Sequence, residues 1–142
     1  MRKLIDKPYA GGQWSVARMR SFVMSALRRA QWPVKYQAVK LAFVKAGINP
    51  STGRMCKLHK CEQCLNLFPQ KDMAVDHIDP VVPIEGFDKA DAFLGYDWDR
   101  VIRRLYCETE GLQVLCKPCH KAKTLDERAE RAAYAKSKKN SK

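Results

Sequence analysis

Apolar residues recur at helical spacing in the first third of the chain. Ser15 can cap a helix, and the apolar residues that follow it stand three and four positions apart, with the arginines largely on other faces. These apolar positions are Val16, Met19, Phe22, Val23, Ala26, Leu27 and Ala30. Pro33 suits the first turn of a second helix, which Gly47 would end. Its candidate core positions are Val34, Ala38, Leu41, Ala42 and Val44. The pattern predicts an N-terminal helical hairpin that packs on the rest.

The pattern changes after this region. Two short strands are expected between Leu65 and Ile78, on either side of a turn at 69–72. Spacings of three and four from Trp98 to Leu105 predict a helix that serves as a lid or buttress, and 112–115 reads as a strand or extended turn. Pro118 then fits the first turn of a last helix, which gives way to a basic tail. We expect an α+β fold with three parts: a basic helical region at 1–50, a core at 51–127, and a helix end and tail at 128–142.

Length and hydropathy narrow the class of protein. A chain of 142 residues fits one domain, or a small domain with an appendage. No apolar run approaches the roughly 18 to 20 residues that cross a bilayer, and the start lacks the apolar core of a signal peptide. We therefore expect a cytoplasmic protein with no membrane partner. In that setting six cysteines are better explained by metal binding than by disulfides.

Positive charge is concentrated in the flanks. The net charge is +12; residues 1–50 carry ten Lys/Arg against one acidic residue, whereas 51–124 are balanced. This distribution favours a nucleic-acid partner bound mostly through its backbone, with steep salt dependence, although solubility or anionic lipid would also account for it. The candidate phosphate contacts are Arg18, Arg20, Arg28, Arg29, Lys121 and Lys123, with Lys35, Lys40 and Lys45 as further candidates. The same helices could instead bind a partner protein.

Two Cys-x2-Cys pairs predict a zinc site. Four thiolates fill a tetrahedral coordination sphere, and the pairs Cys61/Cys64 and Cys116/Cys119 match in chemistry and spacing. A Cys-x2-His pair, Cys56 and His59, is a less well matched alternative. We therefore interpret Cys56 as a free thiol, His59 as a surface residue and Cys107 as a small buried apolar residue.

Closing the zinc site would bring Asp76 and His77 toward His120. A divalent ion held by Asp76 and His120 could neutralise charge on a phosphodiester, and a neutral histidine could accept a proton from water. Hard cations favour oxygen ligands, so magnesium is plausible there, with manganese tolerated. The alternatives are a structural buried histidine at 77 and a fifth candidate zinc ligand at 120.

The joined motifs resemble a known family. Asp76-His77-Ile78, followed by Leu112-Gln113-Val114-Leu115-Cys116-Lys117-Pro118-Cys119-His120 and Lys121-Ala122-Lys123-Thr124, is similar to the small zinc-bearing phage-type members of the His-Asn-His (HNH) endonucleases. The resemblance covers about residues 56–127. It implies a ββα-metal fold in which His77 is the general base, Asp76 and His120 hold Mg²⁺ or Mn²⁺, and Cys61, Cys64, Cys116 and Cys119 hold a structural zinc ion. It also implies DNA as substrate, nicked or cut on both strands, in the host cytoplasm if the protein is phage-encoded.

One position departs from the family pattern. The family's middle Asn, which braces the loop of the base, is Gly111 here, preceded by Glu110. Two alternatives to an active nuclease follow: a zinc-ribbon-like module that binds nucleic acid without cutting it, and an accessory subunit of a phage DNA-processing or packaging complex. The sequence contains no recognisable base-reading element and specifies no oligomeric state, so we expect low or moderate sequence specificity.

Overall fold

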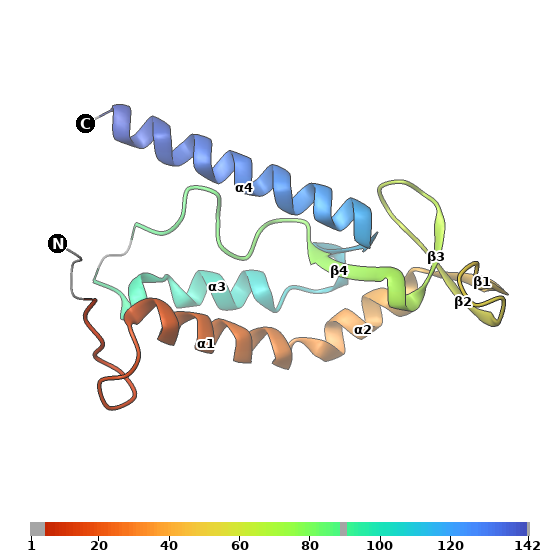
Figure 1. The fold of residues 1–142 in the computed structure, drawn as a ribbon, viewed down its shortest axis with the longest axis horizontal. Coiled ribbons are helices and arrows are strands. Elements are labelled where there is room, and N and C mark those ends of the chain that lie inside the picture. Colours follow the sequence, from red (N-terminus) through yellow and green to blue (C-terminus); the bar gives the residue numbers. More distant parts are fainter. Residues whose placement is uncertain (1–4, 89–90, 142) are drawn as a thin grey trace.

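The computed structural model describes residues 5–88 and 91–141, and its architecture is α+β (Figure 1). The helices are α1 (Val16–Ala30), α2 (Trp32–Leu41), α3 (Trp98–Leu105) and α4 (Lys117–Asn140). The strands are β1 (Phe43–Ile48), β2 (Met55–Lys60), β3 (Leu67–Pro69), β4 (Met73–His77) and β5 (Leu112–Cys116). Single 3-10 turns occur at Gln70–Asp72, Phe93–Gly95 and Thr109–Gly111. No helix of these described residues is both long and apolar enough to span a bilayer.

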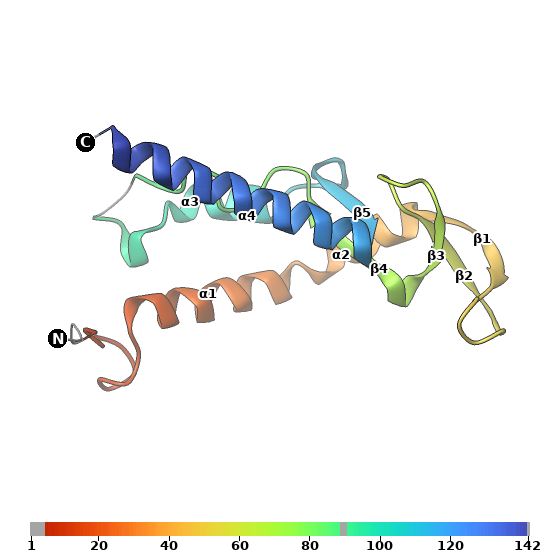
Figure 2. The same ribbon diagram turned by 45° about the horizontal axis from the view of Figure 1, so that its top comes forward.

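The strands form two separate antiparallel sheets. One has the order β1-β2-β3, and the other pairs β4 with β5 in a register that runs from Met73 opposite Cys116 to His77 opposite Leu112. Figure 2 shows the three-stranded sheet at one end of the molecule, while α1, α3 and α4 extend toward the other end. Both strands expected between residues 65 and 78 are present, but they pair with β2 and β5 instead of with each other.

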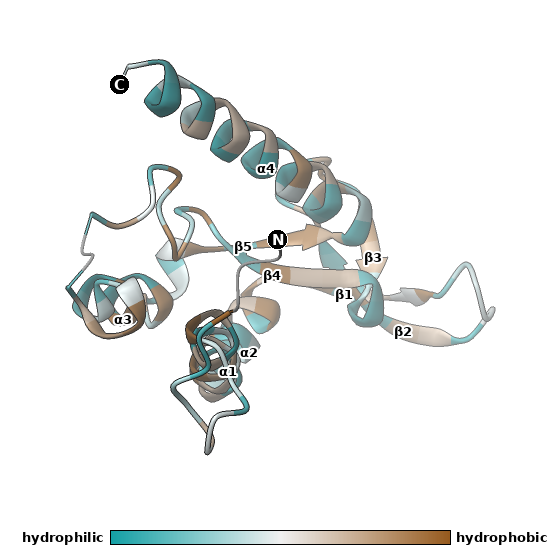
Figure 3. Ribbon diagram, turned by 60° about the vertical axis from the view of Figure 1, so that its left-hand side comes forward, coloured by the Kyte–Doolittle hydropathy of each residue, from teal (hydrophilic) through white to brown (hydrophobic). Residues whose placement is uncertain are grey.

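Helices α2 and α4 hold the β4–β5 pair between them (Figure 3). On one side Ala38 of α2 packs on Leu112 and Val114 of β5. On the other side α4 starts directly after β5, with Pro118 in its first turn, where the missing N–H costs nothing. Because β4 pairs only with β5, its other edge is free to line a cavity.

The expected N-terminal hairpin is wrong. Only Gln31 separates α1 from α2, and its backbone is itself helical, with φ −74° and ψ −6°. The chain therefore does not fold back: α2 runs on from α1 with a bend (Figure 1). Pro33 lies in the first turn of α2, where proline is tolerated and need not reverse the chain.

The buried positions of this region also differ from the expected stripe. Met24 is the buried residue of α1, where it joins Val81, Val101 and Leu105 in a core cluster, whereas Phe22 is 52% exposed. Leu41 and Val44, expected in the core, are exposed because α2 ends at Leu41 and the chain continues as β1.

Two expected boundaries fall inside continuous elements. The boundary at residue 50 lies in the turn of the β1–β2 hairpin. The boundary at 127 and the expected loss of structure at Lys136 both lie within α4, which reaches Asn140. After Pro118 this helix contains neither Gly nor Pro and is rich in Ala, Lys, Glu and Arg, which are strong helix formers.

Candidate functional site

The four cysteines of the two Cys-x2-Cys pairs form one cluster, here called the zinc knuckle. Their Sγ atoms all lie within 4.8 Å of one another. Cys61 and Cys64 belong to the turn that follows β2, Cys116 ends β5, and Cys119 lies in the first turn of α4. A backbone hydrogen bond from Leu65 N–H to Cys61 O closes the turn of the first pair, and one from Glu62 N–H to Val114 O joins that turn to β5. Four sulfurs at this separation suit a tetrahedral zinc ion.

The protonation of the knuckle also suits a cation. Burial opposes ionisation of Cys61, but hydrogen bonds from backbone groups of Cys116, Cys64 and Gln63 outweigh it and lower the pKa of Cys61 to about 6. A hydrogen bond to Cys116, together with burial, raises the pKa of Cys119 to about 12. One thiolate forms readily and the next is opposed, and a bound divalent cation would favour ionisation of all four sulfurs.

Cys56, His59 and Cys107 lie outside the zinc knuckle and differ in their surroundings. Cys56 is a partly buried free thiol. His59 is only 2% exposed and lies edge-on to Phe43, so its expected surface position is wrong: pairing of β2 with both β1 and β3 places it at the centre of the sheet. Cys107 is half-buried and packs on the Ala38–Leu112–Val114 cluster.

A cavity of about 330 Å³, here called the His77 cavity, lies along the free edge of β4. It is lined by Arg28, Lys35, Ala74, Val75, Asp76, His77, Pro80, Val81, Val82, His120, Glu127 and Arg131. The expected catalytic residues Asp76, His77 and His120 thus line one space. Their ligand atoms do not gather as tightly as the sulfurs do, because the only such group of three or more among the described residues is the zinc knuckle.

His77 is held through one ring nitrogen. Its Nε2 lies 3.0 Å from the carbonyl oxygen of Leu105 and 2.9 Å from the side-chain nitrogen of Gln31. Gln31 is fully buried, and its amide also donates to the Leu105 carbonyl. The contacts come from the α1–α2 junction and from the end of α3, which are distant in sequence from His77. Nδ1 of His77 makes no hydrogen bond within the described residues.

Burial sets the charge of His77. It lowers the pKa of the ring below 6.5, and nearby Lys35 and Arg28 act in the same direction, against the Leu105 carbonyl and Asp76. The ring is therefore neutral at pH 7. In the tautomer whose Nε2–H donates to Leu105 O, the lone pair is on Nδ1, and the Gln31 amide donates to the Leu105 carbonyl and not to His77.

Asp76 is oriented by Lys123 of α4. The Lys123 ammonium lies 2.6 Å from Oδ2 of Asp76, 2.8 Å from the His77 carbonyl oxygen and 2.6 Å from Oε1 of Glu127. Burial alone would lower the pKa of Lys123, but the two carboxylates raise it above 10.5, so the ammonium stays charged. Gln113 also donates to Oδ2. Oδ1 of Asp76 and the ring of His120 accept no hydrogen bond from the described residues, and both can offer an electron pair to a divalent ion.

Gly111, which stands where the resembled family has Asn, still supports the loop after β4. Its carbonyl oxygen accepts a hydrogen bond of 3.0 Å from the backbone N–H of Ile78, directly after His77. A Cβ atom at this position would lie 2.7 Å from Sγ of Cys107, closer than side chains tolerate. The brace is therefore a backbone hydrogen bond, and the space of the missing side chain is filled by Cys107.

The candidate phosphate contacts do not share one face. Arg28 lines the His77 cavity, and no hydrogen bond or ion pair engages its side chain within the described residues; the same holds for Lys35. Arg18 lies over the Trp14 ring, and Arg20 donates to Leu94 O and lies over the Tyr96 ring. The remaining candidates are Arg29, beside Arg18 and Phe22, Lys121, exposed on α4, and Lys123, bound to Asp76.

Sequence reasoning did not identify several residues of the cavity. Gln31 carries no sequence signal, because a lone Gln before Trp-Pro is unremarkable. Glu127 and Arg131 could have been found from their helical spacing: with His120 and Lys123 they stand three and four positions apart along α4. Arg131 donates to the backbone carbonyls of Val82 and Pro83 and thereby ties the loop after β4 to α4.

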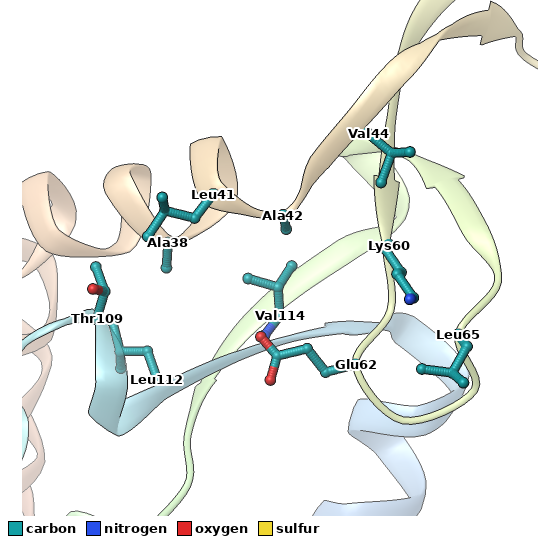
Figure 4. A pocket seen from close by; sticks show the side chains of 10 residues that line it. All are labelled: Ala38, Leu41, Ala42, Val44, Lys60, Glu62, Leu65, Thr109, Leu112 and Val114. Carbon is teal, nitrogen blue, oxygen red and sulfur yellow. The ribbon is translucent and has the colours of Figure 1, made fainter.

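A larger cavity, of about 510 Å³, lies on the other side of β5, beside the zinc knuckle. Figure 4 shows that most of the side chains lining it are aliphatic, including Leu41, Leu112 and Val114. Its carboxylate, Glu62, accepts a hydrogen bond of 3.4 Å from Val114 N–H. With no histidine in its lining, this cavity offers less for acid–base chemistry than the His77 cavity does.

Comparisons with known proteins add no relative. Neither the family models, nor the curated proteins, nor the solved structures contain a match to this chain.

Proposed function

We propose that this protein is a metal-dependent endonuclease of the HNH type that hydrolyses DNA phosphodiester bonds. The observation that carries the proposal is the His77 cavity, in which the three residue types needed for the reaction line one space. The succession β4–β5–α4, with a cysteine cluster at its base, agrees with the ββα-metal core that the sequence resemblance implies.

His77 would act as the general base. The Leu105 carbonyl accepts from Nε2–H, and the Gln31 amide, which donates to the same carbonyl, lies against the ring, so Nδ1 carries the lone pair that accepts a proton from water. The depressed pKa keeps the ring unprotonated at neutral pH. Such a base typically contributes a factor of roughly 10² to 10⁴ in rate.

Asp76 and His120 would hold the catalytic Mg²⁺ or Mn²⁺ ion, which when bound supplies positive charge for the phosphorane and the leaving oxygen, worth several kcal/mol. Lys123 fixes Oδ2 of Asp76 and thereby directs the carboxylate. Arg28 and Lys35 add free positive charge on the opposite wall of the cavity, where a phosphodiester can be bound.

The decisive experiment is cleavage of supercoiled plasmid. With Mg²⁺ or Mn²⁺ the parent protein should nick or linearise the DNA, and His77→Ala should lose roughly 10² to 10⁴ in rate while it keeps its zinc and its melting temperature. His59→Gln is the matched control, a second buried histidine outside the cavity. Parent-level cleavage by His77→Ala would refute the assigned base.

The same experiment separates the non-catalytic alternative. Binding of DNA without cleavage under any divalent ion would identify a zinc-stabilised nucleic-acid-binding module or accessory subunit. The Lys123–Asp76 ion pair favours this alternative, since it engages part of the expected metal-binding carboxylate.

A further inference from the structure

Two aromatic rings stack on the surface of α2. Trp32 and Tyr36 are one helical turn apart, and their rings lie 5.1 Å apart with an angle of 10° between their planes. Trp32 is 63% exposed and Tyr36 is 39% exposed. The core-facing side of this helix is marked by buried Ala38, so the ring pair belongs to its outer flank. Large aromatic side chains exposed together commonly mark a binding surface.

Cations continue the row at both ends. The Lys40 ammonium lies 4.7 Å from the centre of the Tyr36 ring, one turn further along. Arg28 stands one turn before Trp32, and it lines the His77 cavity together with Lys35. The set Arg28, Trp32, Tyr36 and Lys40, here called the aromatic track, recurs every four residues and leads from the cavity along the end of α1 and the length of α2.

The two helices that carry the aromatic track bear charge of one sign. The sequence has no acidic residue between Asp6 and Glu62. Beyond Tyr36 and Lys40 lies a smaller cavity of about 160 Å³, which is also lined by Lys57 and His59. A polyanion matches this surface, whereas an acidic or neutral peptide would leave the ring faces without flat partners.

We propose that the aromatic track binds an unpaired segment of DNA next to the His77 cavity. A base of a single strand exposes its faces and can extend the Trp32–Tyr36 stack on the outer face of Trp32, with Tyr36 supporting that ring from behind. The phosphates lie against Arg28, Lys35 and Lys40. Bases of a duplex already stack on each other, so duplex DNA reaches the cations but not the rings. The inference rests on the proposed nuclease function in one respect only, that the bound strand leads toward His77. The substrate would then be DNA that is branched, has a single-stranded overhang or is locally melted.

Binding can be measured without cleavage. Fluorescence anisotropy of a labelled thymidine oligonucleotide, and of the same oligonucleotide annealed to its complement, is followed with no divalent cation and no chelator added, so the zinc stays in place. Replacing both rings, Trp32→Ala with Tyr36→Ala, should weaken single-strand binding by roughly ten- to hundredfold and leave duplex binding unchanged. Lys40→Ala should lower the salt slope of single-strand binding by about one.

Two variants control for folding and for exposed rings in general. Trp32→Phe keeps an aromatic face and should retain most of the single-strand affinity. Tyr134→Ala removes a ring that is 40% exposed on α4, away from the track, and should change nothing. Parent-like single-strand binding by the double variant would overturn the proposal and assign the surface to a protein partner; equal losses for single strand and duplex would overturn it as well. If single-strand binding depends on the aromatic track but the protein does not cleave plasmid, only the proposed nuclease function is refuted.

Discussion

The zinc knuckle and the His77 cavity are built in opposite ways. The knuckle takes two cysteines from the turn after β2 and two from the junction of β5 with α4, and each pair is complete within four residues of sequence. The cavity takes Arg28 from α1, Lys35 from α2, His77 from β4 and Arg131 from α4. The first is local chemistry repeated twice, and the second exists only after the whole chain has folded. Replacing a single cysteine should therefore abolish metal binding by the knuckle, whereas a single substitution in the cavity should lower its activity only in part.

The largest effect is expected at the knuckle. Cys116→Ser removes a buried ligand, and because binding of a structural zinc ion contributes directly to folding, the variant should lose its zinc and its cooperative thermal transition. Zinc analysis and circular-dichroism melting measure both. Cys56→Ser, outside the cluster, should keep both properties. A Cys116→Ser protein with normal zinc content and melting temperature would show that the knuckle is not a zinc site.

A smaller loss, in cleavage rate, is expected when the contact of Gln31 with His77 is removed. Gln31→Ala leaves Nε2 and the Leu105 carbonyl without the amide, so the base is less well positioned, and kcat should fall roughly ten- to hundredfold with KM nearly unchanged. Gln37→Ala, on the exposed side of α2, is the control. Gln31→Asn should recover part of the rate if positioning is the cause. A rise in KM alone would instead make Gln31 a substrate-binding or purely structural residue.

Two neighbouring arginines, Arg28 and Arg29, test whether the cavity side of α1 contacts the phosphates of DNA. Arg28 faces the His77 cavity and Arg29 does not, although they are adjacent in sequence. Arg28→Gln should weaken DNA binding severalfold and lower its salt slope by about one, because one phosphate contact is lost. Arg29→Gln should leave the slope unchanged. Equal slopes for the two variants would remove Arg28 from the phosphate path.

The smallest effect is expected in the pH dependence of the cleavage rate. The base must be unprotonated, so the rate should fall as the pH drops through the His77 pKa, which burial holds below 6.5. Plasmid nicking between about pH 5 and 8 at constant metal concentration should therefore have its acid-side midpoint below 6.5. A midpoint above 6.5 would assign the titration to another group.

The two regions also differ in how well the sequence predicts them. Spacing and periodicity alone predict the cluster of four cysteines, the helix at Trp98–Leu105 and the strands around Val75 and Val114. The direction of the chain at Gln31 does not: one residue between two helices either reverses the chain or continues it, and only tertiary contacts decide. His59 was misplaced for a similar reason, because its burial depends on strands β1 and β3 on both sides.

The candidate chemistry shows the same division. Asp76, His77 and His120 were expected together and line one cavity, yet their roles remain predictions. The supports of His77 could not be foreseen, since Gln31 and Leu105 lie 46 and 28 residues away in sequence. Lys123 was expected on DNA and instead binds Asp76 and Glu127, because its position on α4 faces β4.

Helix α4 starts inside the zinc knuckle and then runs for 24 residues. With a metal ion held by the four sulfurs, it would act as a lever that pivots at that ion: Arg131 is twelve residues beyond Cys119, roughly 18 Å along the axis at 1.5 Å per residue. A tilt of about 10° at the pivot would swing that guanidinium by about 3 Å, enough to break its grip on Val82 and Pro83. The radius of an ion bound between the sulfurs would then affect the position of Arg131. Exchanging zinc for the larger cadmium ion tests how strongly that position depends on the ion.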